Sequence, residues 1–555
     1  MASSKIEEPN DNTVNRPDVV VTKDNTNEHA GAERAPAQKA TFFMIFFAIW
    51  ISFASWIANF DLGYQGVVLI MPTFNNAFGT CQMVPGPTGA PMEVCQLSVL
   101  RQSLTNVVSI FTGVGGVLAG ITGHYIGRRG TMQLASAIVI IGAAGMLGTS
   151  SNFLHYMVFK CISGVGIGQL LASSLVYGTE CIVASQRGLI LGMYNYGLTL
   201  GNVAAAAVCA GSSHLAATNN WQWKTPIICQ IPLGIILAAG TMMFPESPYW
   251  LMTKDREEAA RTSFAQFYKK DPSSAEITAQ VQSVKEYIEI ERAASATTSW
   301  TEIYHSHDIR RTFASTICLL GVSLTGINLV APYAALFLHG LGITNPYLIN
   351  VIIGLCIFAG ALLGPVVLEY GGRRFSMLCA FAAMASCMLI FSAVSSALGP
   401  NNPQSQRVLV AFLCIWAFVF GGGFAPAAWL TSAELHSVRL RTYGQANTTF
   451  FYQIFQFGAT FWTPYMLNND YGDMGTNVGY FYFGITVVWF ILVFLFVPET
   501  ARLTLEQIDD YYMSSRPAWK TSMKVNKQIA MGNNTLGATT HEAKNGVDCV
   551  HSEKV

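Results

Sequence analysis

One carboxylate lies inside the first long apolar stretch of this chain, where it could carry out chemistry. Asp61 is the only acidic residue within positions 44–71, a stretch rich in aliphatic and aromatic residues. A carboxyl group in such a segment needs a polar cavity or a partner, and loss of hydration favours its protonated form. We therefore interpret Asp61 as a candidate proton carrier. A permanent salt bridge between two helices is the alternative.

A second group of charged residues occurs twice, in the same order in each half of the chain. The first repeated motif is Gly127-Arg128-Arg129, which recurs as Gly372-Arg373-Arg374. The second is Glu180 with Arg187, which recurs as Glu434 with Arg441. The third is Pro245-Glu246-Ser247, which recurs as Pro498-Glu499-Thr500. Arginines at helix ends can pair with carboxylates at neighbouring ends. Solvated arginines that only follow membrane topology are the alternative, but they leave the two glutamates unexplained. Such an internal repeat is typical of transporters with a substrate site between parallel halves.

The elements that must position these residues are membrane-spanning helices. The 555 residues are 51% hydrophobic and 12% charged, whereas soluble domains carry about 25% charged residues. Twelve apolar stretches approach the ~20 residues that a spanning helix needs. They lie at 44–71, 103–123, 131–149, 154–176, 189–210, 225–244, 313–338, 347–368, 376–397, 409–432, 446–467 and 478–497. The sequence predicts an all-α integral membrane protein with two six-helix bundles.

The distribution of Lys and Arg predicts the orientation of these helices. Alternate connections carry the repeated arginines, whereas the segment 75–100 contains neither Lys nor Arg. By the positive-inside rule, both termini and the loop 253–311 are cytoplasmic. We expect a disordered cytoplasmic tail (1–40), a first bundle (41–250), a cytoplasmic linker with short helices (251–311), a second bundle (312–500) and a second cytoplasmic tail (501–555). The composition after Pro517 indicates that this part of the second tail is disordered as well.

Two cysteines differ from the rest in their position. Cys81 and Cys95 lie in the connection after the first stretch, among Pro and Gly. Because this connection is expected to face an oxidising exterior, the two residues are candidates for a disulfide. Two unpaired surface thiols are the alternative.

The repeated sequence motifs resemble those of the sugar porter family of the major facilitator superfamily. The similar stretches are Phe60-Asp61-x-Gly63, Gly123-x-x-x-Gly127-Arg128-Arg129, Glu180 with Arg187-Gly188, 245–251, Gly326-Ile327-Asn328, Glu369-x-Gly371-Gly372-Arg373-Arg374, Glu434 with Arg441, and Pro498-Glu499-Thr500. The outward connection and the tails are most similar to fungal members, many of which are proton symporters for mono- or disaccharides, and parts of the second half resemble fungal α-glucoside permeases. The resemblance implies a twelve-helix fold in the plasma membrane and sugar import by alternating access, with proton symport favoured.

In that family the helix-end charges latch the cytoplasmic side in the outward-facing state. The resemblance assigns this role to Arg128, Arg129, Glu180, Arg187, Glu369, Arg373, Arg374, Glu434 and Arg441. His124 stands where the family usually has Asp. A first-half latch that is weaker or sensitive to pH is one expectation. A histidine that merely lies in the headgroup region is the other.

The resemblance also supplies a partner for Asp61. Lys160 stands where proton-coupled members carry an Arg that controls this carboxylate. The Lys ammonium is a compact charge without the planar, bidentate geometry of an Arg guanidinium, but it can serve as the counter-charge. We expect an ionic Asp61–Lys160 pair in one state and a protonated acid in another.

A sugar site needs amide and hydroxyl groups to bind ring hydroxyls, and aromatic faces. The candidates are Asn195, Asn202, Asn328, Tyr333, Phe424, Trp429, Tyr452, Gln453 and Gln456. Asn328 matches the sugar-binding Asn of the family, but Val322 and Ser323 replace the two Gln that usually precede it. The pocket therefore departs from the usual hexose pocket, and a disaccharide, glycoside or polyol is an alternative ligand. Each polar side chain could instead bond only to a neighbouring helix.

Other classes of function are less consistent with the sequence. We find no nucleophile–base arrangement, metal-ligand spacing or nucleotide-binding motif, so we expect neither an enzyme nor a primary pump, and no cofactor. The net charge of zero gives no sign of nucleic-acid binding. The expected partners are a sugar, a proton and the lipid bilayer, and we expect a monomer. A facilitative sugar uniporter and a non-transporting sugar sensor remain as alternatives.

Overall fold

The computed structural model describes residues 41–530, except for 86–90, 183–186, 298, 306–307, 332, 342–344, 401, 438, 469, 504 and 515. The expected tail 1–40 and the last 25 residues, 531–555, lie outside the described residues. The chain from Thr41 onward forms one compact unit.

The first bundle consists of long apolar helices. They are α1 (Phe42–Val68), α4 (Val108–Leu147), α5 (Phe153–Cys181), α6 (Arg187–Ser212) and α7 (Trp221–Thr241). Helix α4 covers two of the predicted stretches, 103–123 and 131–149, which join at Gly127. This residue has φ 82° and ψ 174°, so the expected connection between two spans is reduced to a single bend.

The second bundle repeats this plan with two interrupted spans. Its elements are α11 (Asp308–Leu324), α12 (Ile327–Val330), α13 (Ala334–Gly340), α14 (Pro346–Gly371), α15 (Arg373–Leu398), α16 (Pro403–Val419), η6 (Phe420–Phe424), α17 (Ala425–Leu435), α18 (Arg441–Leu467) and α19 (Val478–Phe496). Gly326, with φ 112°, separates α11 from α12. Element η6 is a π-helix that contains three successive glycines. Such turns form where α-helical preference is weak.

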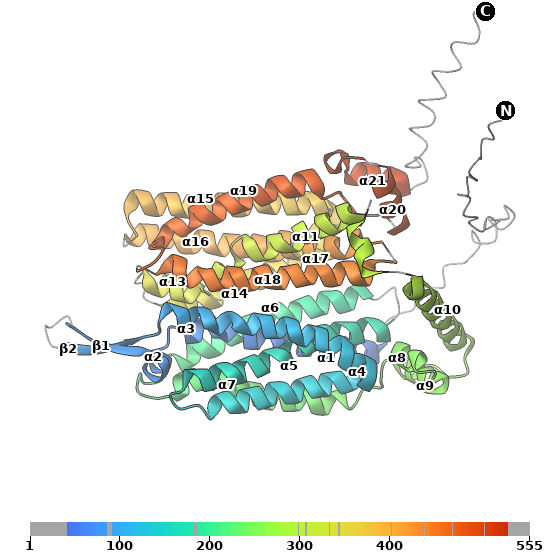
Figure 1. Cartoon of the computed structure of the whole chain (residues 1–555), viewed down its shortest axis with the longest axis horizontal. Coiled ribbons are helices and arrows are strands. Elements are labelled where there is room, and N and C mark those ends of the chain that lie inside the picture. The colour runs from blue at the N-terminus through green and yellow to red at the C-terminus, as the bar shows by residue number, and fades with distance from the viewer. Residues whose placement is uncertain are drawn as a thin grey trace, which may run out of the picture. The chain divides into compact units, whose positions relative to one another are not determined.

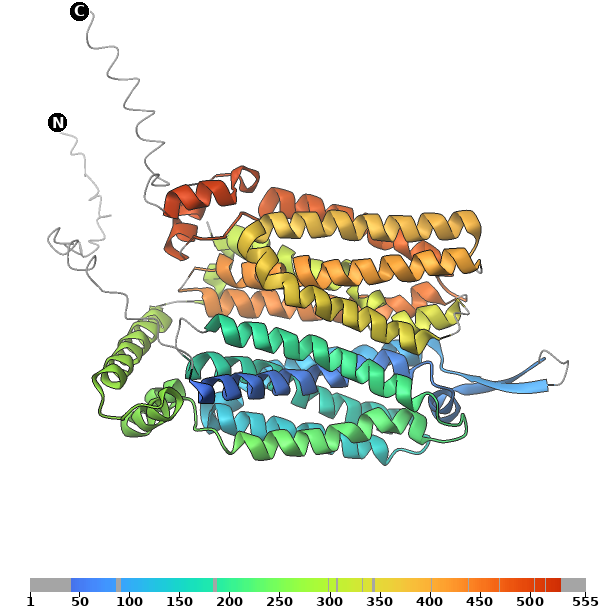
Figure 2. The ribbon, with the colours of Figure 1, turned by 180° about the vertical axis from the view of Figure 1, so that it is seen from behind.

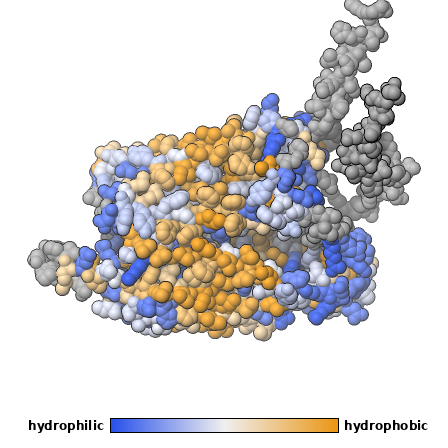
Figure 3. All heavy atoms as spheres, in the orientation of Figure 1, coloured by the Kyte–Doolittle hydropathy of each residue, from blue (hydrophilic) through white to orange (hydrophobic). Residues whose placement is uncertain are grey.

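Each bundle has six membrane-spanning segments among the described residues, as predicted. In the first bundle α4 counts as two segments. In the second bundle α11–α13 count together as one segment, and so do α16–α17. Nine of the described helical segments are long and apolar enough to span by themselves, with α4 counted once. Helices α6 and α18, which carry several of the predicted polar site residues, are not among the nine. Apolar side chains cover the middle of the visible face, and hydrophilic ones gather at its two ends (Figure 3).

Short elements mark the two ends of the bundles (Figures 1 and 2). At the hairpin end lie α2 (Pro72–Phe78), β1 (Thr80–Pro85), β2 (Pro91–Gln96), α3 (Val99–Leu104), η3 (Thr105–Val107) and η7 (Gly475–Asn477). At the linker end lie α8 (Pro248–Thr253), α9 (Glu257–Tyr268), α10 (Ala275–Thr297), η5 (Trp300–Tyr304), α20 (Leu505–Met513), η8 (Ala518–Lys520) and α21 (Met523–Ala530). The composition after Pro517 had indicated disorder, but Asn526 bonds to the carbonyl groups of Glu499 and Ala501 and holds α21 to the second bundle.

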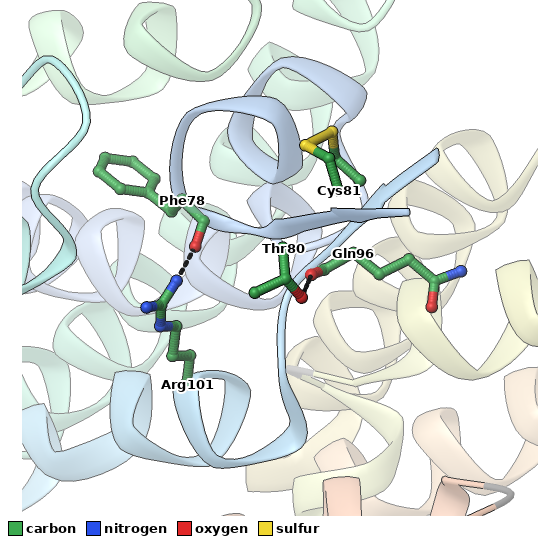
Figure 4. Close-up of a disulfide and its surroundings, with 6 residues drawn as sticks. Phe78, Thr80, Cys81, Gln96 and Arg101 are labelled. Atoms are coloured by element: carbon green, nitrogen blue, oxygen red, sulfur yellow. Dashed lines mark hydrogen bonds between the residues drawn. A yellow bond between two sulfur atoms is a disulfide. The ribbon is translucent and has the colours of Figure 1, made fainter. Parts of the chain in front are cut away.

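The hairpin is closed by a disulfide between Cys81 and Cys95, which face each other in the antiparallel register. The Thr80 hydroxyl donates to the Gln96 carbonyl at 3.4 Å, and the Arg101 guanidinium donates to the Phe78 carbonyl (Figure 4). The first contact joins the two strands, and the second joins α3 to α2 at the base of the hairpin.

Candidate transport site and helix-end charge networks

Asp61 and Lys160 form a buried ion pair in the first bundle. Lys160 Nζ lies 2.9 Å from Asp61 Oδ2, and both side chains are 0% exposed. The ammonium also donates to the Asp61 carbonyl oxygen at 3.2 Å and to the Tyr64 hydroxyl at 2.9 Å. Mutual attraction offsets the desolvation of two charges only where additional hydrogen bonds satisfy them. The additional bonds to Lys160 meet this condition.

Close helix packing positions the pair. Asp61 lies on α1 and Lys160 on α5, and these helices are in contact. A Cβ at Gly63 would lie 3.1 Å from Asn202 Cα on α6. A Cβ at Gly166 would lie 2.9 Å from the backbone of Val139 on α4. The glycines therefore let α1 and α5 approach their neighbours closely.

The structure brings two of the predicted sugar-binding residues together. Asn328 on α12 and Gln456 on α18 exchange amide hydrogen bonds, with Gln456 Nε2 donating to Asn328 Oδ1 at 2.6 Å. Asn328 Nδ2 also donates to the Ser323 carbonyl at 2.7 Å, and its side chain is buried. The break at Gly326 gives Asn328 this position near the middle of an interrupted span.

The aromatic candidates have different surroundings. The buried Tyr333 hydroxyl accepts a hydrogen bond from Asn106 Nδ2 of the other bundle. Trp429 packs edge-on against Tyr452, with ring centroids 5.3 Å apart. Phe424 is buried in the core of the second bundle, 4.4 Å from the Phe381 ring centroid.

The remaining candidates lie on α6 and α18. Asn195 and Asn202 are half-buried, and Asn202 lies next to Gly63 of α1 and Gly354 of α14. Gln453 lies near Gly113 of α4, so it too is at the boundary between the bundles.

Three hydrogen bonds join the bundles within the described part of the chain, and all three lie toward the hairpin end. One is the Asn106–Tyr333 bond. The Ser103 hydroxyl donates to the Phe461 carbonyl at 2.9 Å, and the Tyr347 hydroxyl donates to the Ile70 carbonyl at 3.5 Å. The bundles are therefore tied together at the hairpin end.

The charges at the linker end form a network in the first bundle. Arg128 donates to both carboxylate oxygens of Glu180, at 2.9 and 2.8 Å. The Ser247 hydroxyl donates to Glu180 at 2.5 Å. Glu246 Oε1 accepts the backbone N–H groups of Arg128 and Arg129, at 2.9 and 3.1 Å. Arg129 contributes its backbone here, and the Arg187 side chain lies outside the described part of the structure.

The second bundle repeats this network. Arg373 donates to Glu434 at 3.1 Å, and the Thr500 hydroxyl donates to Glu434 at 2.6 Å. Glu499 accepts the backbone N–H groups of Arg373 and Arg374, at 2.9 and 3.1 Å.

The other predicted latch residues have separate partners. The Arg374 guanidinium donates to the Phe494 carbonyl at 2.8 Å rather than to Glu434. Glu369 pairs with Arg502 at 3.3 Å. Arg441 is exposed and forms no ion pair with a described carboxylate.

Two histidines adjoin the networks. His124 Nε2 lies 3.4 Å from Lys254 Nζ. His436 is buried between α17 and α18. Burial, together with the charges of Arg441 and Arg311, lowers the pKa of His436 from 6.5 to about 4.

Glu246 and Glu499 were not among the predicted latch residues, although they hold the backbone at both bends. Their sequence signal was the repeat of Pro245-Glu246-Ser247 as Pro498-Glu499-Thr500. Their position relative to Gly127 and Gly372 depends on the tertiary fold, which a linear motif does not reveal.

Comparisons with known proteins agree with this arrangement. The family model described as "Sugar (and other) transporter" matches residues 47–512. The chain is similar to the probable glucose transporter rco-3 of Neurospora crassa, with 28% identity over 86% of this chain and 80% of that protein. It is similar to the high-affinity glucose transporter ght2 of Schizosaccharomyces pombe, with 29% identity over 86% of this chain and 89% of that protein.

Solved structures show the same fold. The inward-open xylose transporter XylE from E. coli has a TM-score of 0.66 and 18% identity, over 84% of this chain and 99% of XylE. The family match covers most of the sequence, and the spans and repeated networks fit the fold. The chain therefore belongs to the Sugar (and other) transporter family, as a multi-pass sugar transporter and not an enzyme, and it has the fold of the major facilitator superfamily.

Proposed function

We propose that this protein imports a sugar across the plasma membrane by proton symport. The observation that carries the proposal is the buried ion pair of Asp61 with Lys160, both 0% exposed. A buried ionisable pair in a membrane helix is costly and usually has a functional role. Protonation of Asp61 would break its ionic bond to Lys160, so proton binding and helix packing would be linked.

The bound sugar would lie between the bundles. Asn328 and Gln456 can exchange their mutual hydrogen bonds for bonds to ring hydroxyls, since each amide both donates and accepts. Asn202 and Gln453 lie at the boundary between the bundles, Asn195 lies on the same helix as Asn202, and Trp429 with Tyr452 offers an aromatic face. The two relatives described above are named as glucose transporters, which supports a hexose as the first substrate to test. A disaccharide is the second.

The networks at the linker end would act as latches in the alternating-access cycle. We propose that this end is cytoplasmic, with both termini on that side, since it carries the repeated arginines. The same proposal divides the chain into a first bundle (41–250), a linker (251–311) and a second bundle (312–500). It also includes a transporter that acts as a monomer.

Asp61→Asn tests the coupling, because the amide keeps the shape of the side chain but cannot carry the proton. Labelled glucose, fructose, xylose and maltose would be offered to cells without their own sugar porters, with external pH varied and with or without a protonophore. We expect wild-type uptake above equilibrium that the protonophore abolishes. Asp61→Asn should lose this uphill uptake and retain exchange of sugar between equal pools.

Intact uphill uptake by Asp61→Asn would refute the role of this carboxylate. Uptake by the wild type that never exceeds equilibrium and ignores the protonophore would identify a facilitative uniporter. No flux of any sugar, with sugar binding retained, would favour a sensor.

A further inference from the structure

Lys160 has a complete set of hydrogen-bond partners, and Tyr64 is one of them. An ammonium group has three N–H donors. They match three acceptors: Asp61 Oδ2 at 2.9 Å, the Asp61 carbonyl at 3.2 Å and the Tyr64 hydroxyl at 2.9 Å. The hydroxyl and the backbone carbonyl can therefore hold the lysine when Asp61 is neutral.

The Tyr64 hydroxyl also contacts the carboxylate. It donates to Asp61 Oδ1 at 3.2 Å. Because Lys160 donates to Oδ2, both oxygens of Asp61 accept hydrogen bonds. This arrangement suits an ionised Asp61, which has no proton of its own to donate.

A proton on Asp61 Oδ1 requires a different arrangement around Tyr64, because this oxygen then carries the hydrogen that points at the tyrosine. The new carboxyl O–H can donate to the second lone pair of the tyrosine oxygen. The tyrosine hydrogen must then turn away from Asp61, by rotation about the C–O bond, toward another acceptor.

Gln230 on α7 offers that acceptor. Its side chain is 0% exposed, and α7 packs against α1, which brings Gln230 within interaction range of Tyr64. Neither its amide oxygen nor its amide nitrogen has a hydrogen-bond partner. A buried amide without partners is unfavourable, and native structures contain few of them. A state in which Gln230 accepts from Tyr64 would account for its presence here.

We propose that Tyr64 and Gln230 form a hydrogen-bond switch that responds to the proton on Asp61. Tyr64 donates to Asp61 when the carboxyl is ionised, and to Gln230 when the carboxyl is protonated. Lys160 retains the Tyr64 oxygen and the Asp61 carbonyl as acceptors in both states. Tyr64 and Gln230 are positioning residues in this scheme, which rests on the proposed function and names its coupling partners.

The surroundings contain no competing charge. The group formed by Asp61, Lys160 and Tyr64 is surrounded by few other titratable side chains. They are Tyr156 and Cys161 on α5, Cys209 on α6 and Cys229 on α7. Helix α13, which also contacts α1, carries only the exposed His339. Among the described residues of α1–α7, Asp61 and Lys160 are the only buried side chains with a formal charge.

The switch predicts opposite effects for two substitutions. Tyr64→Phe removes a donor to the ionised carboxyl and also an acceptor for the protonated carboxyl. The bond to the ionised group is the stronger of the two, so the protonated state is favoured, and the decline of uphill uptake at alkaline pH should move to higher pH. The difference between the two bonds corresponds to a shift of about one pH unit. Gln230→Leu removes the acceptor needed by the protonated state, so this decline should move to lower pH, by about half a unit.

Two matched variants serve as controls. Tyr156→Phe changes a buried tyrosine whose hydroxyl has no partner, and Gln65→Leu changes a buried glutamine whose amide has none. The measurement is sugar uptake into proteoliposomes against pH, with sugar exchange as a check that each variant still binds and moves substrate. We expect both controls to keep the wild-type midpoint.

The two proposals fail in different ways. Wild-type uptake that is independent of pH and of a protonophore would refute proton symport, and the switch with it. Coupled wild-type uptake with shifts of the same sign, with no shift, or with equal shifts in the controls would refute the switch alone. If Tyr64→Phe does not fold, the sign of the Gln230→Leu shift still decides.

Discussion

Individual buried charges in this protein are stabilised by several hydrogen bonds each, and the sequence revealed only some of the partners. The isolation of Asp61 in an apolar stretch indicated a buried carboxylate, and the family position indicated Lys160. Tyr64 and Gln230 were not found, because hydroxyl and amide groups are common in membrane helices. Which of them face Asp61 depends on how α1 and α7 are rotated.

His436 provides a test of burial at a single residue. Its pKa of about 4 in the folded protein lies below the ordinary value of 6.5. The unfolded chain therefore takes up the proton first as pH falls, and folding stability decreases between pH 6.5 and 4. The loss approaches at most about 3 kcal/mol below that window. We expect His436→Gln to reduce this loss, measured as thermal unfolding in detergent from pH 7.5 to 4.

His155→Gln is the control, because His155 is exposed at the start of α5. It should leave the pH dependence of unfolding unchanged. A wild-type curve that His436→Gln does not flatten would contradict a buried neutral histidine.

At the scale of helices, hydropathy predicted the spans but not their interruptions. The twelve stretches correspond to the observed segments, because each must shield its backbone from lipid. The break at Gly326 and the π-helix at Phe420–Phe424 have the same apolar composition as continuous helix. At Gly127 the sequence predicted a connection between two spans, and the structure has a bend within one helix instead. These features arise from backbone conformation and from tertiary contacts such as the Glu246 bonds.

Gly127 tests the bend in α4. Its φ of 82° is unfavourable for any residue with a Cβ, and a Cβ would collide with the Glu246 carboxylate. We expect Gly127→Ala to lower the free energy of unfolding by roughly 1–3 kcal/mol and to weaken uptake, since Glu246 must move from the Arg128 and Arg129 backbone. Thermal unfolding and uptake would be measured together.

Gly120→Ala is the matched control on the same helix. A Cβ there meets nothing within 4 Å, and alanine has the higher helix propensity. Stability should therefore remain equal or rise slightly. A Gly127→Ala variant as stable as Gly120→Ala would show that the bend does not need glycine.

At the scale of the whole molecule, the repeat in the sequence predicted two equivalent bundles but not their relative arrangement. Both copies contain the same Arg–Glu network, and each network lies within its own bundle. The bonds that join the bundles involve residues outside the repeated motifs, such as Asn106 and Tyr333. A duplicated sequence specifies each half, whereas the contacts between halves differ from one conformational state to the next.

The fraction of molecules that are closed at the hairpin end should therefore change with these bonds, while the fold of each bundle stays intact. Tyr333→Phe removes the bond from Asn106, and Ser103→Ala removes the bond to the Phe461 carbonyl. A hydrogen bond between membrane helices contributes ~0.6 kcal/mol, which changes a two-state ratio about threefold. We expect each variant to increase the population open at the hairpin end, and the double variant to increase it further.

Spin labels at Leu100 on α3 and Leu348 on α14, each 52% exposed, would report the separation of the bundles at this end. The labelled protein would lack the exposed Cys379. Ser213→Ala is the control, because Ser213 directly follows α6 and its hydroxyl bonds to the Ala210 carbonyl of that helix, within the same bundle. A longer distance in Tyr333→Phe and Ser103→Ala, but not in Ser213→Ala, would show that these bonds hold the hairpin end closed. An unchanged distribution in the double variant would mean that helix packing alone closes it.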